Sequence, residues 1–235
     1  MSIIEGPLGR IEPPDFDHVE SYPLSALPED SQPIYAPVVL GVNWYEAFDR
    51  PSKDKRTGRQ WIGLEDLGRI RGGHAVCLLP ARTADTYDWW EFYDQGSEGA
   101  CVGFAASRMM TLLNRRRYDA RWLYREAQQV DEWPGEDYDG TSVRAAMDVL
   151  RTRGHREVRA GESDAESISD GISENRWARS ADEVLAALGT PHLDYVTILN
   201  SWGRYGYPHF TRMSAGVLQR LLDENGEAAI VTDRP

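Results

Sequence analysis

The spacing of the apolar residues changes twice along this chain of 235 residues. Short runs rich in β-branched residues at 37–44 and 72–79 predict buried strands. From Ala100 the apolar residues recur at helical spacing, and strand character returns at 195–199. The pattern predicts an α+β fold whose middle section is helical. Further helices are predicted over 120–129, 142–153, 180–189 and 214–223, a last strand over 228–232, and loops over 49–59 and 161–173.

Composition and charge exclude several classes of protein. The formal net charge is −12, from 26 Lys and Arg against 38 Asp and Glu, which opposes binding to phosphate backbones and anionic lipids. No apolar stretch approaches the roughly 18 to 20 residues of a membrane span, and the first residues lack an export signal. The sequence therefore predicts a cytoplasmic monomer with no nucleic-acid and no membrane partner.

The two cysteines, Cys77 and Cys101, are too few for a disulfide scaffold or a four-cysteine zinc site. No other spacing fits a metal, so neither a metal nor another cofactor is expected. Cys77 lies on a predicted apolar strand and is expected to be buried and unreactive. Cys101 lies in the first turn of a predicted helix, where the helix dipole and the unsatisfied N–H groups favour a thiolate.

The residues before Cys101 favour its interpretation as a nucleophile. The segment 94–101 reads D-Q-G-S-E-G-A-C, a glycine-rich approach to the helix. Gln95 could place its side-chain amide beside the backbone N–H of Cys101 and so provide two donors for an oxyanion. An arbitrary cysteine in a helix is more often inert packing, but the glycines and Gln95 favour the functional interpretation over that alternative.

A second segment, N-S-W-G over 200–203, follows the predicted strand 195–199. Together the two segments resemble the papain-like cysteine peptidases, whose nucleophile region reads Q-G-x-C-G-x-C-W and whose asparagine region reads N-S-W-G. The resemblance implies that Cys101 is the nucleophile, that Gln95 stabilises the oxyanion, and that Asn200 orients the catalytic imidazole.

The resemblance also implies residues that bind the substrate or cover the site. Trp202 matches the indole that shields the contact between the asparagine and the histidine. Asp139 and Gly140 match a glycine-bearing stretch that lines the substrate cleft. These three residues are expected at the substrate-binding site.

The catalytic histidine is expected at an unusual place in the chain. In the family it follows the cysteine, on a strand that opens with G-H-A-V. Here the G-H-A-V segment contains His74 and precedes Cys101. Between Cys101 and Asn200 lie only His155, predicted to be a solvated loop residue, and His192, in a junction opened by proline. His74 is therefore the expected general acid–base, in the order His, Cys, Asn, and His192 is the alternative.

The resemblance implies a two-lobed fold, with a helical lobe and an antiparallel β-barrel lobe in a rearranged chain order. The proline-rich region 1–33 is expected to be an extended arm. Region 34–90 would supply the part of the barrel lobe that carries the histidine, 91–160 the helical lobe, and 161–235 the rest of the barrel lobe. The implied activity is that of a cysteine endopeptidase acting on peptides or proteins through an acyl-enzyme. A catalytically inactive binding module of this fold and an acyltransferase using the same cysteine remain alternatives.

Overall fold

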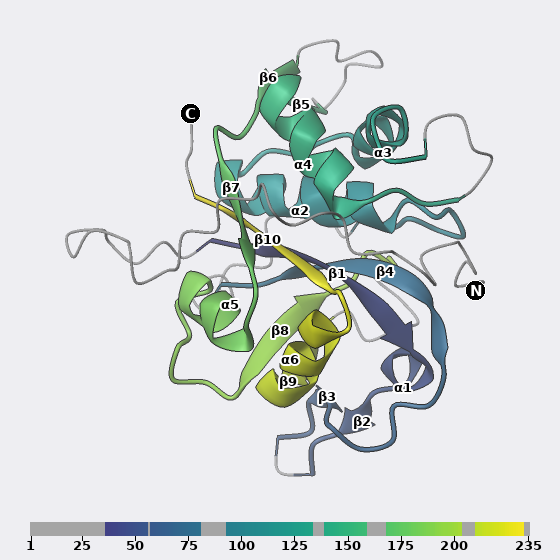
Figure 1. Ribbon diagram of the computed structural model, residues 1–235, viewed down its shortest axis with the longest axis vertical. Coiled ribbons are helices and arrows are strands. Elements are labelled where there is room, and N and C mark those ends of the chain that lie inside the picture. Colours follow the sequence, from purple (N-terminus) through teal and green to yellow (C-terminus); the bar gives the residue numbers. More distant parts are fainter. Residues whose placement is uncertain are drawn as a thin grey trace.

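An eight-stranded sheet crosses the centre of the molecule, with helices on both of its faces (Figure 1). The computed structural model describes residues 36–55, 57–80, 93–133, 139–158, 168–203 and 210–232. The strands of the large sheet are β1 Val38–Tyr45, β2 Ser52–Lys53, β3 Gln60–Ile62, β4 Ile70–Leu78, β7 Asn175–Ala178, β8 Tyr195–Leu199, β9 Phe210–Ser214 and β10 Glu227–Val231. Their order is β2-β3-β9-β8-β4-β1-β10-β7, and only β3 and β9 pair in parallel.

The helices form two groups separated by the sheet. Figure 1 shows α2, α3 and α4 on one side and α5 and α6 on the other. The short α1 directly follows β1, and β5 and β6 form a small separate sheet beside the α2–α4 group. The bounds are α1 Glu46–Asp49, α2 Cys101–Asn114, α3 Ala120–Gln128, α4 Val143–Thr152, α5 Ala181–Ala187, α6 Ala215–Asp223, β5 His155–Arg156 and β6 Ile168–Asp170.

Strand β1 is buried on both faces, which explains its nearly continuous run of apolar residues. Val38 and Leu40 pack in the cluster that includes residues of α5 and α6. Val39, between them, packs in the cluster beneath α2, α3 and α4. Two hydrophobic cores therefore share one sheet, and side-chain alternation decides to which core each residue belongs.

The predicted long elements are confirmed, and several short strands were missed. The helices predicted from the apolar spacing and the strands at 37–44, 72–79, 195–199 and 228–232 all form. The predicted loops are wrong in part, because 49–59 contains β2 and 161–173 contains β6. β2, β6, β7 and β9 are short and largely polar, so only pairing with neighbours identifies them as strands. The expected arm 1–33 lies outside the described residues.

The chain is thus a mixed α/β protein in which strands from its two ends interleave. β1 and β4 precede the helical section in sequence, yet they lie between β8 and β10, which follow it. None of the helices within the described ranges has both the length and the apolar character that a membrane-spanning helix requires.

The ends of the β1–β4 segment lie close to later parts of the chain. Before β1, the N–H of Ala36 donates to the carbonyl of Ala187, at 3.0 Å. After β4, the N–H of Leu79 donates to the carbonyl of Thr197, at 3.0 Å. The segment 36–80 therefore begins and ends beside the residues that flank the junction at 190–193.

Helix α2 carries Cys101 and depends on one glycine for its contact with α3. A Cβ on Gly103 would lie 2.5 Å from the carbonyl oxygen of Ala120 and 2.7 Å from the Cβ of Tyr124. Backbone atoms cannot move away as a flexible side chain can. Gly103 therefore allows the two helices to approach closely.

We expect Gly103→Ala to destabilise the fold by about 1–3 kcal/mol, because the added methyl group overpacks the contact between α2 and α3. The matched control is Gly216→Ala in α6, where the added Cβ would meet only the side chain of Leu64, which is 60% exposed. That substitution should be neutral or should stabilise the helix by up to about 1 kcal/mol. Urea unfolding measures both; a Gly103→Ala protein as stable as the wild type would contradict the packing argument.

Candidate active site

His74 and Asn200 are brought together by the neighbouring strands β4 and β8. The two residues are 126 positions apart in sequence, and their side chains are joined by a hydrogen bond of 2.9 Å between Nε2 and Oδ1. An amide oxygen only accepts, so Nε2 of His74 carries the proton. Nδ1 of the neutral ring therefore keeps a free lone pair and can act as a base.

Two indoles hold the imidazole of His74 in place. The ring of Trp202 stacks on it at 5.2 Å and 28°, and the ring of Trp44 meets it edge-on at 4.5 Å and 71°. Both tryptophans are almost completely buried. This packing limits rotation of the ring and keeps water from the hydrogen bond with Asn200.

Burial makes His74 a weak base at rest. Loss of solvent around the ring lowers its pKa from 6.5 to about 4, and the hydrogen bond with Asn200 offsets only part of that effect. At neutral pH the imidazole is therefore uncharged.

The segment before α2 is tied to the segment that carries Asn200. The N–H of Gln95 donates to the carbonyl of Ser201 at 2.9 Å, and the N–H of Gly203 donates to the carbonyl of Tyr93 at 3.1 Å. Gly203 has φ +72°, and a Cβ there would lie 2.8 Å from a carboxylate oxygen of Asp94. A glycine at 203 thus permits the pairing that positions Cys101 relative to Asn200.

Cys101 is the first residue of α2, and it lines the same cavity as His74. The cavity has a volume of about 330 Å³. Its walls come from β1, β4, the start of α2, the start of α4 and the turn before β10, and Thr141, Glu224 and Glu227 are among its polar residues. Cys101, which is a partly exposed residue, therefore borders a space that can hold a ligand.

The thiol of Cys101 lies among backbone donors. Helix α2 has no side-chain N-cap, whereas Ser142, Ser180 and Ser214 cap the helices that follow them. Burial raises the pKa of the Cys101 thiol, and hydrogen bonds with the backbone of Ala75 and Val102 act in the opposite direction. The raised pKa keeps the resting thiol protonated.

No hydrogen bond joins His74 and Cys101 among the described residues, although both border one cavity. The shifts of both pKa values favour neutral groups, because each group loses solvent and neither gains an opposite charge. The resting site is therefore a neutral thiol and a neutral imidazole.

The other cysteine, Cys77, is fully buried, and burial raises its pKa to about 12. Both findings agree with the expectation that Cys77 is unreactive.

Gln95 lies near the cysteine but does not reach the cavity. It is buried, its Nε2 donates to the carbonyl of Glu98 at 3.1 Å, and its Oε1 has no hydrogen-bond partner. It is not among the described residues that line the cavity. In this state the amide is used to hold the turn before α2.

The three residues expected to bind substrate, Asp139, Gly140 and Trp202, lie at different distances from the candidate site: none lines the cavity, but Trp202 contacts His74. Asp139 is exposed, and neither it nor Gly140 is among the described lining residues, although the next residue, Thr141, is. Gly140 has φ +145°, and its N–H donates to the hydroxyl of Tyr124 at 3.2 Å. Trp202 covers the imidazole of His74 and belongs to the hydrophobic core.

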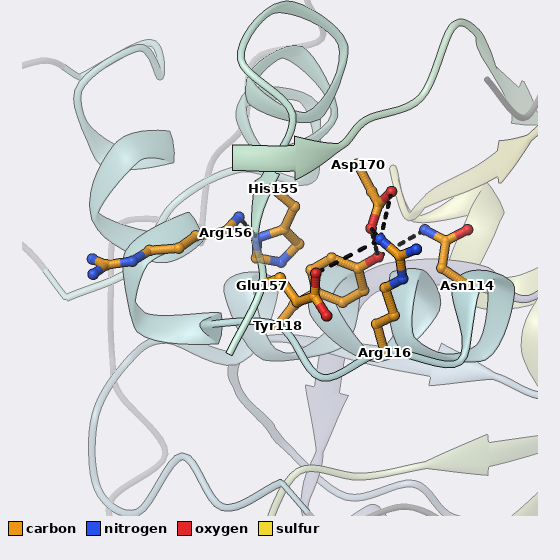
Figure 2. Close-up of polar contacts among 7 residues, drawn as sticks. All are labelled: Asn114, Arg116, Tyr118, His155, Arg156, Glu157 and Asp170. Atoms are coloured by element: carbon orange, nitrogen blue, oxygen red, sulfur yellow. Dashed lines mark hydrogen bonds and ion pairs between the residues drawn. The ribbon is translucent and has the colours of Figure 1, made fainter. Parts of the chain in front are cut away.

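The prediction that His155 is a solvated loop residue is wrong. His155 is fully buried in β5, its Nδ1 accepts from the N–H of Arg156, and its Nε2 lies 2.8 Å from the hydroxyl of Ser107. The ring stacks on Tyr118 at 4.7 Å. Figure 2 shows it beside the hydrogen bond of 2.5 Å between Tyr118 and Asp170 of β6. Both ring nitrogens of His155 are engaged, so we interpret it as a structural residue.

His192, the alternative candidate for the base, is exposed. It is not among the residues that line either of the two described cavities.

Sequence reasoning missed several residues of the site. Trp44 contacts the imidazole, Ala75 contacts the thiol, and Glu224 and Glu227 line the cavity. Only Trp44 carried a signal, as a large aromatic residue at the end of an apolar strand. Within the described ranges, no group of three or more His, Cys, Asp or Glu side chains could hold a metal ion.

Comparison with known proteins finds little similarity. No protein-family model matches the chain, and no curated protein matches it. Among solved structures, the chain is similar to the crystal structure of xylellain, a cysteine protease from Xylella fastidiosa, with 16% identity and a TM-score of 0.45. The match covers 62% of this chain and 84% of that chain. A likeness at this level assigns neither a family nor an activity, so a functional assignment depends on the site.

The low pKa of His74 predicts a loss of stability in mild acid. Between pH 6.5 and about 4 the unfolded chain binds a proton at this residue and the folded protein does not, so the free energy of unfolding falls as the pH falls. Below about pH 4 both states are protonated and this contribution becomes constant. We expect His74→Gln to reduce the slope of stability against pH in that window by up to about 1.36 kcal/mol per pH unit. Urea unfolding at several pH values tests this, with His192→Gln as control; equal slopes for wild type and His74→Gln would contradict it.

Proposed function

We propose that this protein is a cysteine peptidase that hydrolyses peptide bonds through an acyl-enzyme, with Cys101 as the nucleophile and His74 as the general acid–base. The observation that carries the proposal is the hydrogen bond between His74 and Asn200 beside a cavity that both His74 and Cys101 line. A nucleophile, a base and a group that orients the base are the parts that such chemistry requires.

The neutral resting pair suits a proton transfer inside the site. The thiol proton of Cys101 moves to Nδ1 of His74 as the sulfur forms its bond to the peptide carbonyl carbon. The same proton then goes to the leaving amine, so the amine departs neutral and a thioester remains. Water attacks the thioester, gives a proton to His74, and the thiol leaves with that proton to restore the starting state.

Asn200 is the proposed orienting residue. Its Oδ1 accepts from Nε2 of His74, so it selects the tautomer whose Nδ1 can take a proton. When the ring is protonated during the reaction, the same contact stabilises the positive charge. The stacked Trp202 keeps solvent from this hydrogen bond.

The oxyanion would be stabilised by the backbone N–H of Cys101 and by the side chain of Gln95. Gln95 lies in the turn tied to Ser201, and its Oε1 has no partner. Its Nε2 donates one of its two hydrogens to the carbonyl of Glu98, and the residue is not among the described lining of the cavity, so the side chain must move to donate to a substrate there. We therefore propose that binding of the peptide turns this amide.

We propose a papain-like two-lobed fold for this enzyme, with an antiparallel barrel lobe and the order His, Cys, Asn. The support is the place of β1 and β4 between β8 and β10, together with the short distances from Ala36 to Ala187 and from Leu79 to Thr197. The same strands can be connected in either order because both ends of segment 36–80 lie beside the junction at 190–193. Peptides or proteins are the proposed substrates, and the segment around Thr141 is the proposed wall for their side chains.

A binding module that does not catalyse is the second candidate. One observation favours it, namely that no hydrogen bond joins His74 and Cys101 while both groups are neutral. The reactivity of Cys101 separates the two functions, because only the peptidase needs a thiol that His74 can deprotonate.

We expect a peptidyl epoxide that reacts with thiol peptidases to label Cys101 and to abolish peptide hydrolysis. Cys101→Ala should lose both labelling and hydrolysis and keep the fold, since the residue begins α2 and the main packing uses other positions. Cys77→Ala is the matched control and should keep both, because Cys77 is fully buried. Mass spectrometry of the labelled peptides and a fluorogenic peptide assay give the readouts. A label on Cys77 would show that the choice of nucleophile is wrong. If neither cysteine is labelled and no peptide is hydrolysed, the binding module is the better description.

Moving segment 34–82 to follow Thr190 tests the proposed chain order. We expect the rearranged protein to fold and to keep Cys101 labelling, because the transferred segment already ends beside Ala187 and Thr197. A control with the same segment inserted after Gln129, at the end of α3 and on the other side of the sheet from α5 (Figure 1), should fold poorly. Circular dichroism and urea unfolding compare the three chains; a rearranged protein that is unfolded, with the wild type stable, would overturn the proposed order.

A further inference from the structure

A second cavity lies on the face of β8 and β9 that the helices α2, α3 and α4 leave open. Along β8, Val196 and Ile198 belong to the core, whereas Tyr195 and Thr197 point to the other face. The core cluster beneath the three helices contains no described residue of β8 or β9. The cavity there has a volume of about 550 Å³, and its described lining shares no residue with the cavity of Cys101.

Among the described residues that line this cavity the charged ones are positive, whereas the net charge of the chain is negative. Arg59 and Arg212 line it, and no Asp or Glu is among its described lining residues. Neither arginine forms an ion pair with a described carboxylate, although the chain has a formal net charge of −12. The guanidinium of Arg212 lies 4.3 Å from the centre of the Tyr195 ring, which fixes its position. Two unpaired guanidiniums at one cavity favour an anion, and a carboxylate fits their donor geometry.

The uncharged residues of the lining indicate further features of a ligand. Leu79, Leu188, Leu193 and Phe210 form an apolar wall. Gln60 also lines the cavity, and its Oε1 is buried without a hydrogen-bond partner. A buried carbonyl oxygen without a donor costs free energy, so a ligand N–H at that point would be favourable.

We propose that this cavity binds the C-terminal residue of a peptide, or an N-acylated amino acid, whose side chain is apolar. The carboxylate would lie against Arg59 and Arg212, the side chain would pack on Leu193 and Phe210, and the amide N–H would donate to Oε1 of Gln60, whose buried amide must turn toward the cavity. The carboxylate would thus meet two guanidiniums that form no ion pair with a described carboxylate, and the amide N–H would meet a carbonyl oxygen that has no hydrogen-bond partner. The site is separate from the proposed peptidase site and does not depend on it.

Isothermal titration calorimetry of the full chain with N-acetyl-L-leucine tests the proposal. We expect binding that weakens at least tenfold with N-acetyl-L-leucinamide, which lacks the carboxylate, and at least tenfold in Arg212→Gln. Arg179→Gln is the control, because Arg179 is exposed and is not among the described residues of either cavity. Weaker binding in Arg212→Gln places the ligand at this cavity and not at the cavity of Cys101, because Arg212 lines only the former.

The urea midpoint of Arg212→Gln shows whether the variant is folded, and Arg59→Gln gives a second substitution if it is not. Three results would overturn the proposal: no binding of N-acetyl-L-leucine, equal binding of the amide, or equal weakening by Arg179→Gln. Failure of N-acetyl-L-leucine to bind would also be seen if another part of this chain occupied the cavity. That result would likewise show that the cavity is not a ligand site.

Discussion

Side-chain alternation along β4 is the constraint on which the cavity depends. His74 points to the core that contains Trp44 and Trp202, and the next residue, Ala75, points to the core that contains α2. Adjacent residues of one strand therefore touch the two halves of the site, Asn200 on one side and Cys101 on the other. A slip of one residue in the pairing of β4 with β1 would exchange the two faces and separate the imidazole from Asn200. The long, doubly buried β1 prevents such a slip because its own alternation is fixed by two cores.

Burial gives the site its order and also its neutral resting state. The rings of Trp44 and Trp202 hold the imidazole and lower its pKa to about 4, while burial raises the pKa of the Cys101 thiol. An ion pair is therefore not the resting form of this site. A neutral thiol and imidazole hold the same number of protons as a thiolate and an imidazolium, so one internal proton transfer connects the two. The polar groups of a bound substrate are what would favour the charged form.

The contacts between neighbouring strands of the sheet do not require one particular order of those strands in the sequence. β4 needs β1 and β8 as neighbours, and their register is set by apolar faces and backbone hydrogen bonds. Because Ala36 lies beside Ala187 and Leu79 beside Thr197, the strands can be joined in more than one order without long connections.

The sequence by itself determined the elements whose pattern is local: the start of α2 at Cys101, the capped helix after Ser180, and the buried strands β1, β4, β8 and β10. It also indicated the roles proposed for His74, Cys101 and Asn200, because those residues stand in short distinctive segments. It failed for His155, where a glycine and a polar neighbourhood suggested solvent, and for the short strand β9. Only the tertiary structure decided these. It alone placed Trp44 against His74, left Gln95 outside the described lining of the first cavity, and placed Arg59 and Arg212 at the second cavity. The physical reason is that local spacing reports on a residue's own turn or strand, whereas burial and contact depend on segments more than a hundred residues apart, such as those of His74 and Asn200.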